Sequence, residues 1–320
     1  MAKYLVTGGS GFIGTNLIDY HLSRQDEIIN FDTTSPRNAK HKGLHKAIDL
    51  LDKNALLAEI NRFEPDYIYH LGARTDLDGL NVGDYLSNTL GLQNLVDCCD
   101  HLHNLKRVIF ASSRLVCEIG HIPKDYSDYC PTTSYGDSKV AGENLIKGSP
   151  PKKWEWCIVR PTSIWGPWFS VPYRNFFNAV EKGLYFHPKN LEVRKSFGYV
   201  GNTVYQLERL MHAPREKVNL KTFYLADYEP IEVMTFANQI AREFKVRKPI
   251  SLPLFLLKVG AKIGDIFSFI GLPSPLTSFR LNNLVTPMIY DLNDLKSVVG
   301  PLPYKTVEGI IQTVAWMRAN

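Results

Sequence analysis

The sequence lacks any long run of lysine or arginine. Its 37 basic and 32 acidic residues give a formal net charge of +5, which is small for a chain of 320 residues. Composition therefore gives no support to a nucleic-acid-binding surface. Long apolar runs are also missing, because the most apolar late stretch, residues 252–270, is interrupted by Lys258, Lys262 and Asp265. We therefore expect no membrane-spanning segment.

Cysteine is scarce as well, with five residues at positions 98, 99, 117, 130 and 157. An odd number without the spacing of a disulfide framework predicts reduced thiols in a cytoplasmic protein. The first apolar run begins at Tyr4, which leaves no room for a signal peptide. Cys99 and His103 have the spacing of one helix face, but no second ligand pair of suitable spacing accompanies them, so we expect no metal site.

What the sequence does contain is an alternation of apolar strand patterns and helix patterns. This alternation predicts an α/β fold, a Rossmann-type doubly wound parallel sheet with helices on both faces. The run at 107–111 is almost continuously apolar, as expected of a strand that is buried on both faces. The expected strands are residues 4–6, 27–31, 46–48, 66–71, 107–111 and 154–159, and the expected helices are residues 15–24, 53–62, 84–103 and 134–147.

Beyond Pro161 the alternation weakens. A helix is predicted at 174–182, and short strands at 197–200 and 222–225 are expected to return to the sheet. Residues from 230 onward contain several prolines and helix patterns, which predict a smaller, mainly helical C-terminal substrate lobe that covers the site. The predicted domains are a Rossmann domain of residues 1–165 with return segments at about 194–228, and a smaller lobe of residues 166–193 and 229–320.

A glycine-rich turn, Thr7-Gly8-Gly9-Ser10-Gly11-Phe12-Ile13-Gly14, lies between the first strand and the first helix. In a dinucleotide site, such glycines allow a tight turn, a close approach of the backbone to the pyrophosphate and close packing of the helix on the strand. The backbone N–H groups at the start of the helix then face the phosphates. Asp32 closes the second strand, where its carboxylate can accept hydrogen bonds from the adenosine ribose. Together these features predict a dinucleotide cofactor.

Tyr135 and Lys139 form a candidate proton carrier. They are four residues apart, which places the phenol and the ammonium on one face of a helix. A free tyrosine has a pKa near ~10, and a cation a few ångströms away can lower that pKa by roughly 1–3. Such a phenol can exchange a proton with a carbinol while a hydride moves to or from nicotinamide. Ser113 follows the strand at 107–111 and can hydrogen-bond the same carbinol oxygen.

With these motifs in this order, the sequence resembles the extended short-chain dehydrogenase/reductase superfamily, in its NAD-dependent nucleotide-sugar epimerase/dehydratase branch. The resemblance is specific over about the first 170 residues and then thins to 197–200, Arg280 and 306–316. It rests on the glycine turn, Asp32, Asp49-Leu50, His70-Leu71-Gly72-Ala73, Asn88-Thr89-Leu90-Gly91, Ser112-Ser113, Tyr135 with Lys139, and Arg160-Pro161-Thr162-Ser163-Ile164-Trp165-Gly166-Pro167.

The resemblance implies an NAD-dependent enzyme with Ser113, Tyr135 and Lys139 as its catalytic triad. Asp32 favours NAD over NADP, because a 2′-phosphate would meet a carboxylate, although Arg37 lies close by in the sequence. The implied substrate contacts are Asn88, Ser163 and Arg280, the last as a ligand of a diphosphate. The implied cofactor contacts are Gly8, Gly11, Phe12, Ile13, Gly14, Asp32, Asp49, Leu50, Leu71, Ala73, Tyr135, Lys139 and Pro161.

The sequence departs from the family pattern at positions that concern the substrate. Relatives that are 4,6-dehydratases carry an Asp-Glu pair where this chain has Arg114 and Leu115, which cannot act as acid and base. Cys117 replaces the usual tyrosine, and Ser163 replaces the usual asparagine that contacts the sugar nucleotide. These departures disfavour a dehydratase. They leave a 4-epimerase or a 4-keto reductase that acts on a nucleotide-activated sugar.

Two alternatives remain open. A hydroxysteroid- or terpenoid-type dehydrogenase of the same superfamily would use the apolar stretch 252–270 to line a pocket or to rest on a membrane surface. We expect that stretch to be an ordinary helix packed on the core. A non-catalytic dinucleotide sensor is disfavoured, because the chain keeps both Tyr135 and Lys139.

The resemblance also implies a two-fold homodimer. In relatives, the helices that correspond to 84–103 and 134–147 pack against their symmetry mates as a four-helix bundle. Both helices carry more apolar residues than one buried face requires, among them Leu92, Leu95, Val140 and Leu145. We therefore expect a homodimer that forms through these helices.

Overall fold

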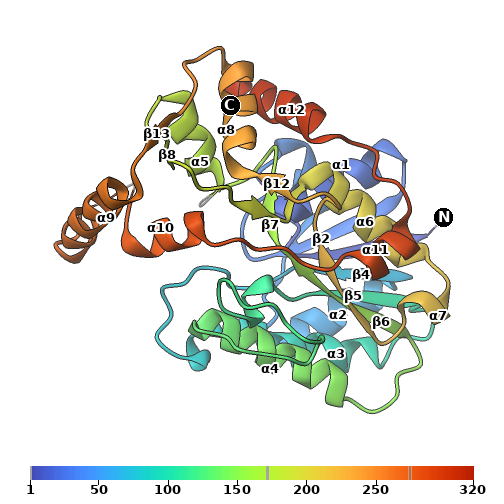
Figure 1. The fold of residues 1–320 in the computed structure, drawn as a ribbon. Helices are drawn as coiled ribbons and strands as arrows, with labels where there is room; N and C mark the ends of the chain where they lie inside the picture. Colours follow the sequence, from blue (N-terminus) through green and yellow to red (C-terminus); the bar gives the residue numbers. More distant parts are fainter. Residues whose placement is uncertain (1, 171–172, 273, 275) are drawn as a thin grey trace.

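A seven-stranded sheet forms the centre of the protein, which a computed structural model describes over residues 2–170, 173–272, 274 and 276–320. The strand order is β11-β6-β5-β4-β1-β2-β3, and all neighbouring strands run parallel (Figure 1). This arrangement confirms the predicted fold class. The strands of the sheet are β1 (Lys3–Thr7), β2 (Glu27–Asp32), β3 (His45–Ala47), β4 (Tyr67–His70), β5 (Arg107–Ala111), β6 (Glu155–Pro161) and β11 (Lys221–Leu225).

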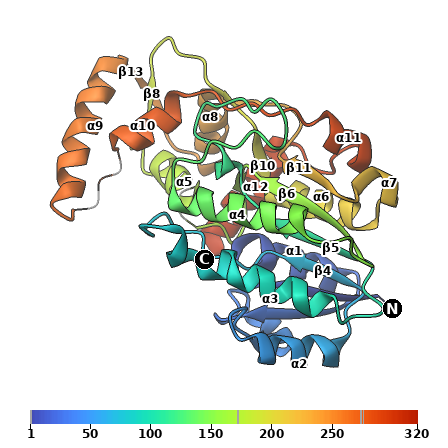
Figure 2. The same ribbon diagram turned by 90° about the horizontal axis from the view of Figure 1, so that it is seen from below.

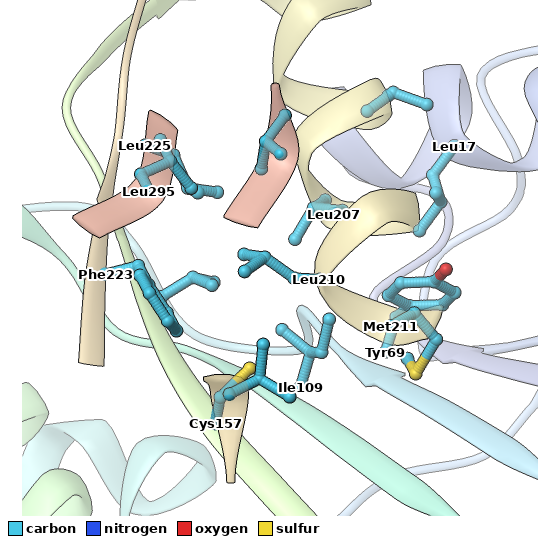
Figure 3. Packing of buried hydrophobic residues seen from close by; sticks show 14 of the residues in the cluster. Leu17, Tyr69, Ile109, Cys157, Leu207, Leu210, Met211, Phe223, Leu225 and Leu295 are labelled. Carbon is cyan, nitrogen blue, oxygen red and sulfur yellow. The ribbon is translucent and has the colours of Figure 1, made fainter. Parts of the chain in front are cut away.

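Helices cover both faces of this sheet. One face is covered by α1 (Phe12–Ser23), α6 (Val200–His212) and α11 (Asn293–Val299), and the other by α2 (Lys53–Phe63), α3 (Leu90–Cys99) and α4 (Ser134–Gly148). Figure 3 shows Leu207 and Leu210 of α6 against strand side chains such as Ile109 and Phe223 on the first face. Both faces are therefore buried in apolar cores.

The apolar run of β5 shows why the sheet could be predicted. Val108 and Phe110 point into the core beneath α2 and α3, while Ile109 points into the core beneath α1 and α6. Successive side chains of a strand face opposite sides of the sheet, so a strand between two cores needs apolar residues at every position.

The remaining segments build a region beside the sheet that is mainly helical. Its own apolar core includes Trp165, Phe177 and Phe236. Short strands are β7 (Ser163–Trp165), β8 (Phe186–Pro188), β9 (Arg194–Lys195), β10 (Phe197–Tyr199), β12 (Ile231–Glu232) and β13 (Ile250–Leu252). Its helices are α5 (Tyr173–Glu181), α8 (Val233–Phe244), α9 (Leu254–Phe269), α10 (Ser278–Val285) and α12 (Thr306–Ala319). The short helix α7 (Arg215–Val218) packs on β11 instead, and the 3-10 turns η1 (Ala39–Leu44), η2 (Val82–Asn88) and η3 (Arg114–Val116) lie in loops between elements of the sheet domain. The domain boundary at residue 165 stays a prediction.

Two predicted elements are wrong. The long helix at 84–103 is broken into η2 and α3, because the buried Tyr85 hydroxyl donates to the Asp76 carbonyl oxygen (2.9 Å) and Tyr85 leaves helical dihedral angles. The Asn88 side-chain amide, at the end of η2, also donates to the Arg74 carbonyl oxygen (2.9 Å). The strand expected to return to the sheet at 197–200 is β10, which pairs with β7 in a separate two-stranded sheet.

The structure also corrects two expectations about apolar surfaces. Leu92 and Leu95 do not belong to a free face, since both are buried in the core of the protein's own chain. Leu86 and Leu90 are exposed instead, and the homodimer stays a prediction. The stretch 252–270 is not an ordinary packed helix, because α9 buries only Leu257, Ala261 and Gly264 and leaves most of its large apolar side chains in solvent.

A buried ion pair ties α4 to the sheet. The Arg160 guanidinium of β6 donates through Nε to Glu143 Oε1 and through Nη2 to Glu143 Oε2, both at 2.8 Å, and neither side chain is accessible to solvent. Arg160 also donates to the Tyr224 hydroxyl (3.0 Å), and the Tyr129 hydroxyl donates to Glu143 (2.8 Å). The pKa of Glu143 is lowered, because the hydrogen bonds and charge of Arg160 outweigh the cost of burial.

We predict that Glu143→Gln lowers the free energy of unfolding by about 3–5 kcal/mol, because Arg160 would remain buried without its counter-charge. Since the folded state lowers the pKa of Glu143, the carboxylate stabilises the protein at neutral pH and this contribution is lost as the pH falls below the ordinary value of 4.5. The variant should lack that pH dependence. Urea unfolding at several pH values measures both effects.

The matched control is Glu192→Gln, which removes the carboxylate of an exposed ion pair with Arg194. Exposed pairs contribute about 0–1 kcal/mol. A loss of stability in Glu143→Gln as small as that of the control would contradict the prediction.

Candidate active site

The site lies at the carboxyl ends of the neighbouring strands β1 and β4. From β1 the chain builds the sheet toward β3, and from β4 it builds the sheet in the opposite direction, toward β11. Gly8 follows β1 with a φ of +73°, and a Cβ there would lie 2.5 Å from the Gly72 nitrogen. A Cβ on Gly14 would lie 2.5 Å from the Gly8 carbonyl oxygen. No larger residue fits at either position, so the turn presses directly against the end of β4 and the first turn of α1.

The first turn of α1 is open to an anion. Its N-cap residue is Gly11, which has no side chain to accept from the amides of Phe12, Ile13 and Gly14. Helix amides without partners attract negative charge, and a glycine cradle lets a phosphate approach them closely. The residues present therefore fit the pyrophosphate of a dinucleotide. The helix begins three residues before its expected start, inside the glycine motif itself.

Asp32 lies at the end of β2 beside the glycine turn. Its carboxylate accepts from the Ser10 amide (3.0 Å) and from the Thr34 amide (2.9 Å), which fixes its orientation at the edge of the cradle. Arg37 also lies beside the glycine turn, where its guanidinium donates to the Ser10 carbonyl oxygen (3.1 Å) and to the Trp168 carbonyl oxygen (2.7 Å).

The loops after β3 and β4 bring the other predicted cofactor contacts to the same edge. The Leu71 amide donates to the Thr7 carbonyl oxygen (3.0 Å), which sets the segment through Ala73 next to the glycine turn. Leu50 is buried, and its carbonyl oxygen accepts from the Asn94 amide (2.9 Å). The Asp49 carboxylate accepts from the Leu51 amide (2.9 Å). The roles of these residues toward a cofactor stay predictions.

Ser113, Tyr135 and Lys139 are brought together at the end of β5. Lys139 Nζ donates to the Ala111 carbonyl oxygen (2.9 Å) and lies 5.9 Å from the centre of the Tyr135 ring. Ser113 Oγ accepts from the Leu115 amide (3.1 Å) in the turn that follows. A Cβ on Gly136 would lie 2.3 Å from the Leu115 carbonyl oxygen, so α4 packs tightly on η3 at this point.

The protonation of this group differs from the expectation. Burial raises the pKa of Tyr135 to about 12, although a hydrogen bond with Ser113 acts in the opposite direction. Burial lowers the pKa of Lys139 to about 8. In the unliganded protein the pKa of Tyr135 is therefore raised rather than lowered, because burial outweighs the hydrogen bond with Ser113. The effect of Lys139 on the phenol stays a prediction. His70 is neutral, since burial and then the charge of Lys139 lower its pKa to about 3.

The three predicted substrate contacts do not form one group in the structure, and two of them hydrogen-bond within the chain. Asn88 uses its amide within the chain, with Nδ2 donating to Ser138 Oγ and to the Arg74 carbonyl oxygen, both at 2.9 Å. Ser163 is buried in β7, just after Pro161 closes β6. Arg280 is exposed on α10, and its guanidinium donates to the Ser274 carbonyl oxygen. Their roles toward a substrate stay predictions.

Arg114 and Lys195 are the cations that sequence reasoning missed as site residues. Both are buried, and Arg114 Nη1 has no hydrogen-bond partner among the described residues. Lys195 Nζ donates to the Asn283 carbonyl oxygen. Burial, and then the positive charge of Arg114, lower the pKa of Lys195 to about 7. Arg114 also lies beside the Tyr290 hydroxyl, where its charge opposes the rise in pKa that burial causes. One signal in the sequence could have identified Arg114 as a site residue, because it directly follows Ser113 of the predicted triad.

One group within the described residues has the composition of a metal site. Cys117, His121 and Cys130 hold their ligand atoms within 4.8 Å of one another. His121 Nε2 lies 3.0 Å from an Asp128 carboxylate oxygen, and Cys117 Sγ donates to the Asp128 carbonyl oxygen (3.1 Å). These side chains therefore already have partners within their own loop.

The chain was compared with known proteins. The model of the NAD dependent epimerase/dehydratase family matches residues 4–226. The chain is 27% identical over 269 residues to a 3 beta-hydroxysteroid dehydrogenase/Delta 5→4-isomerase of Mycobacterium tuberculosis, which covers 78% of this chain and 71% of that protein. It is 25% identical over 334 residues to a UDP-glucose 4-epimerase of Vibrio cholerae, with 99% and 96% covered.

The fold is similar to that of a solved UDP-glucose 4-epimerase from Thermotoga maritima, determined with UDP-glucose. The TM-score is 0.76, the identity is 18%, and 99% of each chain is covered. The likeness extends over the seven-stranded sheet and the C-terminal helical region alike.

Asp32 leads to a prediction about cofactor choice. A 2′-phosphate beside its carboxylate would cost roughly 1–3 kcal/mol in a half-buried site, and Arg37 is held by two carbonyl oxygens. We expect NAD(H) to bind at least about tenfold more tightly than NADP(H). Calorimetric titration measures both affinities, and Asp32→Asn should narrow the difference. Equal affinities in the unaltered protein would mean that Arg37 leaves its carbonyl partners and reverses the preference.

Proposed function

We propose a function for this chain from the premise that it belongs to the NAD dependent epimerase/dehydratase family. Within this family, we infer that it oxidises and reduces a sugar carbinol in a nucleotide-activated sugar, as a 4-epimerase or a 4-keto reductase. The glycine turn and the first-turn amides of α1 would hold the dinucleotide, whose nicotinamide would supply the hydride acceptor and donor for the carbinol carbon. The reduced cysteines suit a cytoplasmic enzyme, since all five are free thiols.

The proposed chemistry of the chain's own residues follows from their protonation. With a pKa raised to about 12, Tyr135 is held as the neutral phenol and is ready to donate its proton to a ketone that is being reduced. In the opposite direction it must receive the carbinol proton, and Lys139 then stabilises the phenolate from the same helix face. Ser113 orients the carbinol oxygen toward Tyr135.

A pair of buried cations without counter-ions supports the nucleotide-sugar assignment. The other buried arginines are paired with carboxylates, Arg107 with Glu155 and Arg160 with Glu143. Arg114 and Lys195 form no such pair among the described residues, and the lowered pKa of Lys195 reflects the cost of burying a second positive charge beside Arg114. A substrate that brings about two negative charges, as a nucleoside diphosphate does, would compensate both cations.

The similarity to a hydroxysteroid dehydrogenase favours a second candidate, a dehydrogenase of a steroid or terpenoid alcohol. The exposed apolar side chains of α9 are also consistent with an enzyme that acts on apolar substrates. A neutral steroid would leave Arg114 and Lys195 without any counter-charge. We therefore rank this candidate second.

Tyr135→Phe tests the proton carrier. The change removes one hydroxyl and keeps the ring, so thermal stability and NAD affinity should be unchanged. Turnover of a UDP-sugar should fall by roughly 10²–10⁴, the usual contribution of general acid–base catalysis. Chromatographic separation of the sugar products measures the rate, and Tyr205→Phe on α6 is the matched control. Near-normal turnover in Tyr135→Phe would make Tyr135 a structural residue.

Arg114→Met tests the cation pair. Because an unpaired buried charge is replaced by an apolar side chain of similar length, the melting temperature of the unliganded protein should stay or rise. The Michaelis constant for a UDP-sugar should rise by at least about tenfold while NAD affinity is unchanged. Arg194→Met is the control, since this neighbour of Lys195 is exposed and paired with Glu192. An unchanged Michaelis constant would remove the support for a diphosphate and promote the steroid candidate.

A further inference from the structure

Helix α9 presents an apolar surface to solvent. Its exposed side chains include Phe255 (64% exposed) and Phe269 (92% exposed). Figure 1 and Figure 2 both show α9 standing at the periphery, on the far side of α10 from the sheet. The exposed large apolar residues of α9 and its C-terminal end are Phe255, Leu256, Val259, Ile263, Ile266, Phe267, Phe269, Ile270 and Leu272.

The helix is held firmly in this position. Its buried stripe, Leu257 and Ala261, packs against Leu281 of α10. A Cβ on Gly264 would lie 1.7 Å from the Leu276 carbonyl oxygen, so only glycine permits this close approach. The Asp265 carboxylate accepts from the Ser278 amide (2.9 Å), which closes the contact. The orientation of the apolar surface is therefore fixed by the fold.

The formal net charge of the chain falls within the sequence segment that contains this helix. Residues 244–290 contain six basic residues and one acidic residue, Asp265, while the rest of the chain contains 31 of each kind. The formal net charge of +5 therefore resides entirely in this segment. The basic residues are Lys245, Arg247, Lys248, Lys258, Lys262 and Arg280.

We propose that α9 lies on the surface of an anionic lipid bilayer, with its apolar side chains in the acyl boundary and its lysines among the headgroups. An exposed apolar helix flanked by basic residues has the physical character of an interfacial helix. A second copy of the chain is a poorer occupant, because a two-fold contact along α9 would set Lys258 and Lys262 near their own symmetry mates. Among the described residues, no helix is long and apolar enough to cross the bilayer.

This inference is independent of the proposed reaction. It concerns a face that carries none of the catalytic triad, and it concerns where the protein binds in the cell rather than which substrate it converts. The face is nevertheless connected to Lys195, because α10 packs against α9 and provides the Asn283 carbonyl oxygen that accepts from Lys195.

Sedimentation of the full-length protein with vesicles tests the proposal. We expect binding to vesicles of phosphatidylcholine mixed with phosphatidylglycerol, weaker binding to phosphatidylcholine alone, and weaker binding again at high salt. Replacing Lys258 and Lys262 by serine should lower the affinity for anionic vesicles by roughly 25-fold, about fivefold for each lysine. Replacing Phe255, Ile266 and Phe269 by serine should lower it by at least about tenfold.

The control variant replaces three exposed apolar residues outside this segment, Leu80, Ile122 and Leu220, by serine. It should bind vesicles like the unaltered protein. All substituted side chains are exposed, so unchanged thermal stability is expected in each variant. The proposal is overturned if the unaltered protein does not bind anionic vesicles, or if the α9 variants bind as the control does. A dimer in light scattering that only the α9 variants dissociate, without vesicle binding, would assign the face to a second copy.

Discussion

The ion pair between Glu143 and Arg160 is the interaction on which the arrangement of the active site depends. Both groups are withdrawn from water, so every remaining lone pair and N–H must find a partner inside the protein. Those partners come from several elements, with Tyr224 from β11, Lys147 from α4 and Tyr129 from the loop before α4. The position of α4 against β6 is thereby fixed to within the length of a hydrogen bond. Because Tyr135 and Lys139 lie on the same helix, their distance from the end of β5 is fixed as well.

Three buried basic side chains are not paired in this way. Lys139, Arg114 and Lys195 have no carboxylate partners among the described residues, and the pKa of the buried His70 is lowered to about 3. An unliganded protein gains no stability from such charges, whereas a ligand with negative groups gains from each of them. The same burial that opposes ionisation of Tyr135 also strengthens its interaction with any charge that is brought close. The paired charges of Glu143 and Arg160 thus stabilise the fold, whereas the unpaired basic side chains are available to a ligand.

The elements that could be predicted are those whose burial leaves a local pattern. The strand 107–111 faces a core on each side, and the glycine turn must avoid contacts that any Cβ would make, so both are visible in the residues alone. The break between η2 and α3 accompanies side-chain hydrogen bonds from Tyr85 and Asn88 to the backbone of Asp76 and Arg74, which no periodicity in the sequence reveals. The burial of Lys195 is equally invisible, since a lysine in sequence is most often solvated. In the sequence, Arg114 stands out only because dehydratases carry an acidic residue at that position. Its proximity to Lys195 is visible only in the folded protein.

The apolar content of α9 was visible in the sequence, but its exposure was not, because composition does not tell whether the chain supplies a cover. The structure shows that the chain covers one narrow stripe with α10 and leaves the remainder open. An exposed apolar surface of this kind weakens solubility, just as an unpaired buried charge weakens stability. The other buried arginines of the chain are paired, and its sheet is covered on both faces. The exposed face of α9 and the unpaired Arg114 and Lys195 differ from that pattern, and each could be completed by a bound partner. The positive charge of the segment that contains α9 would match an anionic surface, as proposed above, and that of Arg114 and Lys195 would match an anionic substrate.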